Sequence, residues 1–139
     1  MCGIAGIYDT SLSKDSIDNK LSAMSNLIEH RGPDDFGIWT HDTAPLGFSH
    51  RRLSIIDLSE NGKQPMTDNN GNWIVFNGEI YNFKQIASEL GENQLKSKSD
   101  TEVILLAYRK WGKECLNKFR GMFAFVIWDE DKQELFCAR

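Results

Sequence analysis

Segments typical of strands and segments typical of helices come in groups along this chain rather than in strict alternation. Two strongly β-prone runs lie near its end, at residues 121–129 and 134–138, and helical periodicity is found at about 15–29, 82–90 and 99–111. A parallel sheet needs a crossover segment between successive strands, and this order does not supply one each time. The order therefore predicts an α+β fold with mostly antiparallel sheets packed against helices.

The first part of the chain predicts one helix and three strands. The apolar run from Cys2 to Tyr8 is typical of a buried strand. Two further strands are expected, one over Phe36–Trp39 and one that begins at Pro45 and continues to Asp57. The helix at about 15–29 places its apolar residues on one face. Those residues are Ile17, Leu21, Met24, Leu27 and Ile28.

The strand expected at residues 72–76 runs directly into the dipeptide Asn77-Gly78. Asn-Gly is most often the two-residue turn of a β-hairpin. However, the segment that follows is helical in pattern, with a capping box formed by Asn82 and Gln85. A junction from strand to helix would present the Asn77 side-chain amide and the Gly78 backbone N–H to a ligand.

The last long helix is expected to begin at Ser99, which forms a capping-box pattern with Glu102. This helix is apolar around most of its circumference and is therefore expected to be largely buried. Asp100 lies in its first turn, where the helix dipole is the simplest reason for a carboxylate. A short strand near Leu95 and a short helix over residues 112–120 complete the expected elements.

Cys2 stands directly behind the initiator methionine. Removal of Met1 would leave one residue that carries both a thiol and a free α-amine. A thiol is a strong nucleophile only as thiolate, and an α-amine with a pKa near 7.7–8.0 can accept its proton. Nucleophile and base can then share one residue, as they do in N-terminal threonine nucleophiles. The alternative is that Cys2 is an ordinary buried residue.

Two adjacent arginines, Arg51 and Arg52, continue an apolar strand pattern. Two interpretations of them stay open. They guard a solvated strand edge with charge, or they place a guanidinium group that forks a carboxylate. Upstream of them, Arg31–Asp35 has the composition of a stiff polar turn.

Composition excludes several classes of function. A net charge of −4 without a basic stripe argues against a nucleic-acid partner. The three cysteines, Cys2, Cys115 and Cys137, are odd in number and widely spaced, which fits a reducing cytoplasm better than a disulfide framework. Cys115 and Cys137 are most simply core residues. No metal-ligand spacing, signal peptide or membrane-spanning run is found.

Six short blocks stand out together, in order and at compatible spacing. They are Met1-Cys2-Gly3-Ile4, Arg31-Gly32-Pro33-Asp34, Arg52-Leu53-Ser54-Ile55-Ile56-Asp57, Asn77-Gly78-Glu79-Ile80-Tyr81-Asn82, Ser99-Asp100-Thr101-Glu102 and Arg120-Gly121-Met122-Phe123-Ala124-Phe125. With these blocks the chain resembles the class II glutamine amidotransferase domain over nearly its whole length. The third and fourth blocks favour the glutaminase half of glutamine-hydrolysing asparagine synthetases over other branches of that family.

The resemblance implies an N-terminal nucleophile hydrolase fold, an αββα four-layer sandwich with antiparallel sheets. It also assigns the reacting groups. Cys2, once Met1 is removed, would be the nucleophile, and its α-amine the base. The side-chain amide of Asn77 and the backbone N–H of Gly78 would form the oxyanion hole.

The resemblance further assigns the groups that hold the substrate, L-glutamine. Arg52 would bind its α-carboxylate, while Glu79 and Asp100 would bind its α-ammonium group; Asn77 and Gly78 would also contact the amide. A free amino acid needs a cation for one end and an anion for the other, so these roles are chemically consistent. The implied reaction is hydrolysis of glutamine to glutamate and ammonia.

By the same resemblance, residues 1–139 would be a partial glutamine amidotransferase type 2 domain, with sheets incomplete at the C-terminus and the synthetase domain absent. Expected partners are L-glutamine and that C-terminal synthetase domain, with no nucleic acid and no membrane; a homodimer is compatible with the resemblance. No cofactor is expected in this chain, because ATP and Mg²⁺ belong to the synthetase domain, which makes asparagine from aspartate. Two alternatives stay open: an amidotransferase with a sugar or peptide acceptor, and a non-catalytic truncated remnant.

Overall fold

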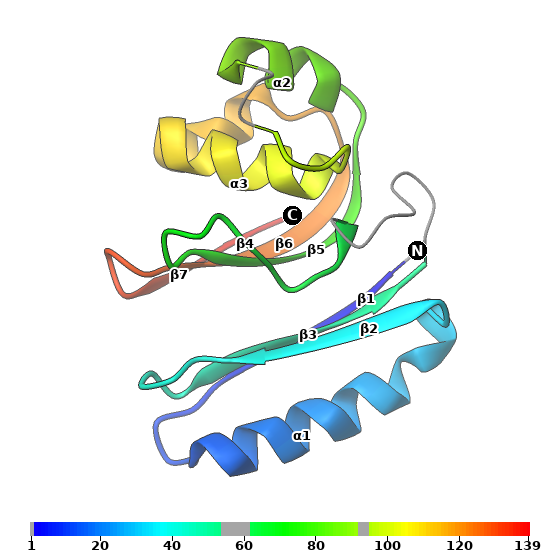
Figure 1. Ribbon diagram of the computed structural model, residues 1–139, viewed down its shortest axis with the longest axis vertical. Helices are drawn as coiled ribbons and strands as arrows, with labels where there is room; N and C mark the ends of the chain where they lie inside the picture. The colour runs from blue at the N-terminus through cyan, green and yellow to red at the C-terminus, as the bar shows by residue number, and fades with distance from the viewer. Residues whose placement is uncertain (1, 54–61, 92–94) are drawn as a thin grey trace. The chain divides into compact units, whose positions relative to one another are not determined.

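The first of two structural units is a three-stranded antiparallel sheet with a helix against one face (Figure 1). The computed structural model describes residues 2–53, 62–91 and 95–139, and this unit holds residues 2–53 and 63–65. The strands follow the order β1-β3-β2. They are β1 (Gly3–Tyr8), β2 (Asp35–Thr40) and β3 (Leu46–Arg52), and the helices are α1 (Lys14–Leu27) and the short 3-10 helix η1 (Glu29–Arg31).

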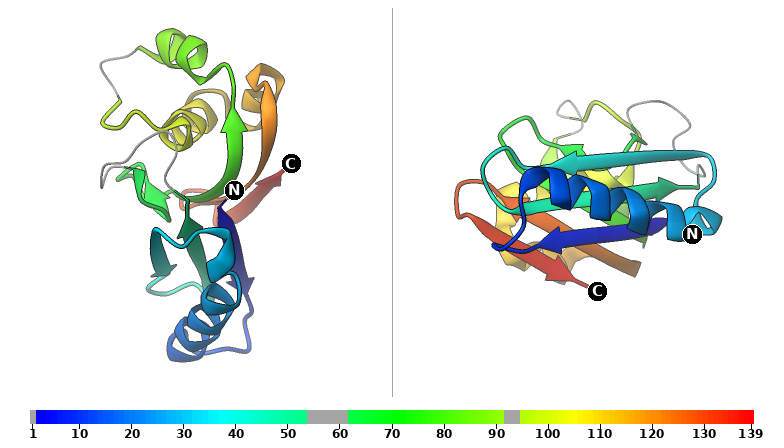
Figure 2. Two further views of the ribbon diagram at one scale, coloured as in Figure 1. Left: turned by 90° about the vertical axis from the view of Figure 1, so that its right-hand side faces the viewer. Right: turned by 90° about the horizontal axis from the view of Figure 1, so that it is seen from below.

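Helix α1 runs along the sheet of the first unit (Figure 2). The Ser13 hydroxyl caps its start by accepting a hydrogen bond from the Ser16 backbone N–H at 3.3 Å. Ile17 and Leu21 are fully buried, as their spacing predicts. Leu27 is 77 % exposed, so the prediction that it shares the buried face is wrong. Ser25 takes the buried position one turn after Leu21, because the 17, 21, 25 row faces the sheet.

The second unit is a four-stranded antiparallel sheet covered on one face by helices (Figure 1). The strand order is β4-β5-β6-β7. The strands are β4 (Met66–Thr67), β5 (Trp73–Ile80), β6 (Gly121–Asp129) and β7 (Glu134–Ala138). The helices are α2 (Phe83–Leu90), α3 (Asp100–Trp111) and the 3-10 helix η4 (Gly112–Lys118).

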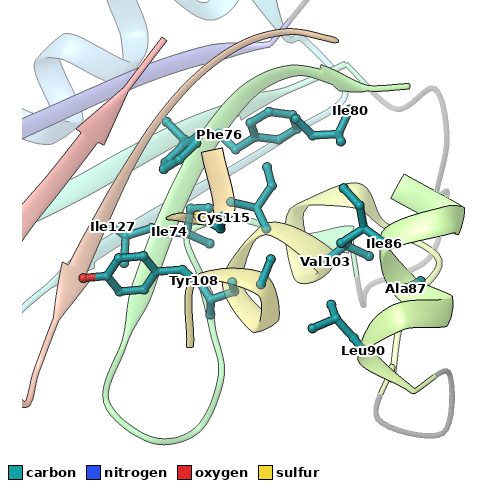
Figure 3. Close-up of a cluster of buried hydrophobic side chains, with 14 residues drawn as sticks. Ile74, Phe76, Ile80, Ile86, Ala87, Leu90, Val103, Tyr108, Cys115 and Ile127 are labelled. Atoms are coloured by element: carbon teal, nitrogen blue, oxygen red, sulfur yellow. The ribbon is translucent and has the colours of Figure 1, made fainter. Parts of the chain in front are cut away.

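The core of the second unit lies between the sheet and α3, with α2 packed against α3 (Figure 3). Alternate residues of β5 and β6 point into it, and α3 contributes five of its buried side chains, among them Val103 and Tyr108. Cys115 is fully buried there, as predicted, and burial raises the pKa of its thiol to about 11. Cys137 is exposed on β7, so its prediction as a core residue is wrong.

The expected capping boxes differ from the hydrogen bonds that form. The Ser99 hydroxyl caps α3 by accepting a hydrogen bond from the Thr101 N–H at 3.1 Å, as predicted. Glu102 does not complete that box, since its carboxylate accepts the backbone N–H groups of Lys96 and Ser97 instead. Asn82 makes no side-chain cap on α2, so the box predicted there is wrong. Leu95 lies in no strand and packs against the core.

The predicted α+β class with antiparallel sheets is confirmed. Each unit contributes one helical layer and one sheet, the layers that an αββα sandwich requires. Strand β3 ends at Arg52, and the rest of the strand expected to reach Asp57 lies outside the described residues. Within those residues, no helix is long and apolar enough to cross a bilayer.

Candidate active site

The register of β1 against β3 brings Cys2 beside Arg52. Gly3 is paired with Arg51, so the residue before Gly3 lies opposite the residue after Arg51. The position is confirmed by two contacts of the Cys2 sulfur with Leu53. Its Sγ accepts the Leu53 N–H at 3.4 Å and donates to the Leu53 carbonyl oxygen at 3.7 Å. The first unit thus places Cys2, the predicted nucleophile, next to Arg52, the residue predicted to bind the substrate carboxylate.

Arg51 and Arg52 point to opposite faces of β3, because successive side chains alternate along a strand. The Arg51 guanidinium lies on the α1 face, where its Nε and Nη2 groups bind Ser25 and Asn26. Arg52 therefore points away from α1. Each residue is only 7 % exposed, so the interpretation of a solvated, charge-guarded strand edge is wrong.

The Arg31–Asp35 turn packs directly onto the end of β3. A Cβ atom on Gly32 would lie 2.4 Å from the carbonyl carbon and oxygen of Arg51, so no larger residue fits without a shift. The backbone N–H of Asp34 donates to the Arg52 carbonyl oxygen at 3.1 Å. This turn therefore supports the backbone that carries Arg52.

In the second unit, Asn77 and Gly78 lie inside β5, so the hairpin-turn interpretation of Asn-Gly is wrong. Gly78 has a φ of +146°, and a Cβ there would lie 2.2 Å from the Met122 carbonyl oxygen on β6. Only glycine accepts this backbone without strain, which explains its place in the block.

The hydrogen-bond pattern of β5 directs the Gly78 N–H away from β6. Tyr81 donates its N–H to the Arg120 carbonyl oxygen at 2.7 Å, and hydrogen-bonded pairs alternate along an antiparallel ladder. The N–H groups of Gly78 and Ile80 therefore point to the opposite edge of β5. In the described part of the chain, β4 covers this edge only at Trp73 and Ile74. The Gly78 N–H thus lies on a stretch of strand edge beyond β4.

Asp100 lies at the same edge. Its Oδ2 accepts the Ile80 backbone N–H at 3.0 Å, and the residue is 5 % exposed. Burial raises the pKa of the Asp100 carboxyl, and the neighbouring charge of Glu79 acts in the same direction. Two strand residues span about 6.8 Å. The Gly78 N–H and the Asp100 carboxylate bound to the Ile80 N–H are therefore about the length of one amino acid apart.

Asn77 contributes a half-buried side chain with an unusual feature. Its Oδ1 is buried and has no hydrogen-bond partner among the described residues. A buried amide oxygen without a partner is costly, and such atoms in folded proteins point to a missing ligand or a stored strain. Rotating the Asn77 side-chain amide by a half-turn would place the donor Nδ2 where Oδ1 now lies.

The six predicted site residues therefore fall into two sets, Cys2 with Arg52 in the first unit and Asn77, Gly78, Glu79 and Asp100 in the second. Three backbone groups at these positions were not predicted: the N–H and carbonyl of Leu53 and the N–H of Ile80. No pattern in the sequence signals them, because they are backbone atoms brought into place by tertiary contacts. Within the described residues, no group of three or more His, Cys, Asp or Glu side chains could hold a metal ion.

Comparison with known protein families decides the identity of the domain. Residues 1–139 match the family described as glutamine amidotransferase domain. The chain belongs to this family. The resemblance read from the six blocks is thereby confirmed for the glutamine amidotransferase domain as a whole.

Relatives of this glutamine amidotransferase domain are named either asparagine synthetase or amidase. Asparagine synthetase (glutamine-hydrolyzing) 1 of Bacillus subtilis (strain 168) is 42 % identical over 144 residues, covering 100 % of this chain and 22 % of that protein. Putative asparagine synthetase (glutamine-hydrolyzing) 2 of Methanocaldococcus jannaschii is 39 % identical, covering 100 % of the chain and 30 % of that protein. Amidase chry2 of Gibberella zeae is 38 % identical, covering 100 % and 22 %. The chain thus spans between a fifth and a third of the length of these relatives.

Proposed function

We propose that this domain hydrolyses L-glutamine to L-glutamate and ammonia with Cys2 as the nucleophile. The observation that carries the proposal is the edge of β5, where the Gly78 N–H and the Asp100 carboxylate are separated by two strand residues. This spacing suits a free amino acid whose side chain ends in an amide. The amide oxygen would accept the Gly78 N–H, and the α-ammonium group would bind Asp100 and Glu79.

The chemistry begins with removal of Met1, which frees the Cys2 α-amine. That amine takes the thiol proton, directly or through a water molecule, and the thiolate attacks the side-chain amide carbon of glutamine. The oxyanion that forms accepts hydrogen bonds from the Gly78 N–H and from Nδ2 of Asn77. Loss of one such donor costs roughly 100- to 1,000-fold in rate in comparable sites.

The second half of the reaction releases both products. The protonated amine returns its proton to the departing nitrogen, and ammonia leaves with the C–N bond broken. A γ-glutamyl thioester on Cys2 remains. Water then attacks the thioester carbon, and glutamate leaves as the Cys2 sulfur takes back a proton. Arg52 holds the α-carboxylate throughout by charge-assisted hydrogen bonds.

The use of the ammonia is a separate proposal. Relatives named asparagine synthetase suggest that a synthetase domain joined to this one amidates aspartate to asparagine, with ATP and Mg²⁺ and release of AMP and pyrophosphate. The three free cysteines are in keeping with the cytoplasm as its compartment. The relative named amidase keeps a second candidate, an amidotransferase with another acceptor such as a sugar or a peptide.

Intact-mass analysis with a glutamine-analogue electrophile, 6-diazo-5-oxo-norleucine, tests the proposal. We expect a protein that lacks Met1 and gains one adduct, mapped to Cys2. Cys137 is the exposed thiol most open to adventitious labelling, so Cys137→Ser serves as the control and should label as the wild type does. Retained Met1, or no adduct at Cys2 in the folded protein, would instead favour a non-catalytic remnant.

A further inference from the structure

The buried Arg51 side chain extends from β3, and its guanidinium group contacts residues of α1, η1 and β2. Nε donates to the Ser25 carbonyl oxygen at 3.1 Å and to the Ser25 hydroxyl at 3.0 Å. Nη2 donates to Oδ1 of Asn26 at 2.8 Å. On β2, the Phe36 ring lies under the group, with its centre 4.9 Å from the guanidinium carbon. These contacts hold β3 to the end of α1.

The charge of Arg51 meets an electrostatic need of α1. The last turn of this helix has no basic residue of its own, and the carbonyl groups there carry partial negative charge. Arg51 supplies the cation from β3, and the Glu29 carboxylate lies 3.7 Å from its Nη1. Lysine cannot replace it, because an ammonium group lacks the planar fork that reaches Ser25 and Asn26 together.

The residues that follow Arg51 carry the candidate site. Gly32 packs against the peptide between Arg51 and Arg52, with no room for a Cβ atom. One residue further, the Leu53 N–H donates to the Cys2 sulfur. The backbone from Arg51 to Leu53 is therefore tied at one end to α1 and at the other to the predicted nucleophile.

We propose that Arg51 is a positioning residue for this site. Its side chain on the α1 face determines that Arg52 points to the other face, since neighbouring strand residues alternate. It also sets the direction of the Leu53 amide that binds Cys2. The inference rests on the proposed glutaminase function, because Arg52 and Cys2 are given their roles there.

The test compares two reagents that alkylate Cys2. The glutamine analogue 6-diazo-5-oxo-norleucine carries an amino-acid head group for Arg52 to bind, whereas iodoacetamide carries none. In Arg51→Lys we expect the alkylation rate with the glutamine analogue, divided by the rate with iodoacetamide, to fall about tenfold or more. Both rates are measured at Cys2 by peptide mass. A role in stability alone would lower the melting temperature and leave this ratio unchanged, which would overturn the inference.

Two further variants keep the test interpretable if Arg51→Lys folds poorly. Asn26→Ala leaves Arg51 in place and removes one of its hydrogen bonds, so the ratio should fall in the same direction by a smaller factor. Lys14→Met is the matched control, because it removes a cation that binds Asp42 by an exposed contact near the other end of α1. An unchanged ratio in Asn26→Ala, or an equal fall in Lys14→Met, would also overturn the inference.

Failure of the proposed function has a different signature. In that case the wild-type Cys2 would not react with the glutamine analogue although Met1 is gone. Hydrogen exchange of the Leu53 amide then still measures the positioning effect, since this N–H donates to the Cys2 sulfur. We expect about tenfold faster exchange in Arg51→Lys than in wild type or Lys14→Met. Equal exchange rates in the three proteins would exclude a positioning role.

Discussion

Asp100 accepts the backbone N–H of Ile80 at 3.0 Å, so the first residue of α3 binds one N–H group of the β5 edge beyond the end of β4. The contact is buried and joins residues 20 apart in the chain. It means that the carboxylate proposed to bind the substrate ammonium group also holds the strand that carries Gly78. Stability and binding at this position can therefore be separated by experiment.

Replacing Asp100 with Asn should keep the fold and weaken the binding of glutamine. The amide oxygen of Asn can still accept the Ile80 N–H, and the buried charge is removed. Because burial raises the pKa of Asp100 above its ordinary value of 3.8, the folded state holds more protons than the unfolded state just above that pH. The free energy of unfolding of the wild type therefore falls as pH rises through this window, and the loss persists at neutral pH.

We accordingly expect Asp100→Asn to be at least as stable as the wild type at neutral pH, by denaturant titration. We expect its KM for glutamine to rise by roughly 10- to 150-fold, because a hydrogen bond to a charged group contributes roughly 1.5–3 kcal/mol and about 1.4 kcal/mol is a factor of ten. A clear loss of stability at neutral pH would show that the charge itself holds β5. Unchanged KM would remove Asp100 from the proposed binding set.

Asp129 should show the opposite pH dependence. It accepts hydrogen bonds from the Tyr108 hydroxyl at 2.8 Å and from the Lys132 ammonium group. Burial acts to raise the pKa of Asp129, but these bonds outweigh it and the pKa is lowered from 3.8. The folded state thus gains stability above the unfolded pKa and loses it as pH falls through the folded pKa.

For Asp129→Asn, we expect a loss of about 1–3 kcal/mol in the free energy of unfolding at neutral pH. The difference from wild type should shrink as pH is lowered in steps toward about 3, because the carboxyl of the unfolded wild type takes up its proton before the folded one, whose pKa is lowered. Denaturant titrations at each pH measure it. A difference that stays constant over that range would mean that packing, not charge, stabilises the β6–β7 hairpin.

Gly78 should be far less replaceable than Gly112, although both have positive φ. A Cβ on Gly112, at φ +57° and ψ −143°, would meet nothing within 4 Å, so Gly112→Ala should cost only the backbone strain of a conformation that favours glycine, of order 1–3 kcal/mol. A Cβ on Gly78 would overlap the Met122 carbonyl oxygen and force β5 from β6. We expect Gly78→Ala to lose roughly 3 kcal/mol or more, measured by thermal unfolding. Similar losses for the two variants would contradict the close approach of the strands.

Much of this fold could be predicted from the sequence because its signals are local. The apolar periods of α1 and α3 and the β-prone runs of β5 and β6 each lie within one element. Strand β4 was not predicted, because a strand of two residues is too short to show the alternation of apolar and polar side chains. Leu27 was assigned to the buried face because its spacing fits a helix, but the sheet covers only the row through Ile17 and Leu21.

The sequence predicts the residue types of the candidate site but not the geometry in which the structure holds them. Nothing local distinguishes Arg51 from Arg52, since only the pairing of β3 with its neighbours decides which guanidinium meets α1. The Ile80 N–H and the Leu53 amide are equally invisible in the sequence. Asn77-Gly78 is typical of hairpins, and the helical pattern after it favoured a junction from strand to helix instead. The two residues lie inside β5, where Gly78 serves the close approach of two strands.

Asn82 provides a test of why a capping pattern failed. Its Nδ2 donates to the Lys118 carbonyl oxygen at 2.9 Å, and its Oδ1 accepts the Arg120 N–H at 2.9 Å, so it joins the end of β5 to the start of β6. Asn82→Ala should lose about 1–3 kcal/mol in the free energy of unfolding, from two hydrogen bonds of about 1 kcal/mol each and the groups left unpaired.

The variant that separates the two explanations is Asn82→Ser. Serine caps helices as well as asparagine does, so a capping role predicts that Asn82→Ser is as stable as wild type. Serine is too short to reach Lys118 and Arg120 together, so the clamp seen here predicts a loss close to that of Asn82→Ala. At Ser99, which does cap α3, Ser99→Asn should be nearly neutral. Urea titrations of Asn82→Ala, Asn82→Ser and Ser99→Asn decide between a capping role and the clamp for Asn82. An Asn82→Ser variant as stable as the wild type would show that the contacts to η4 and β6 contribute little.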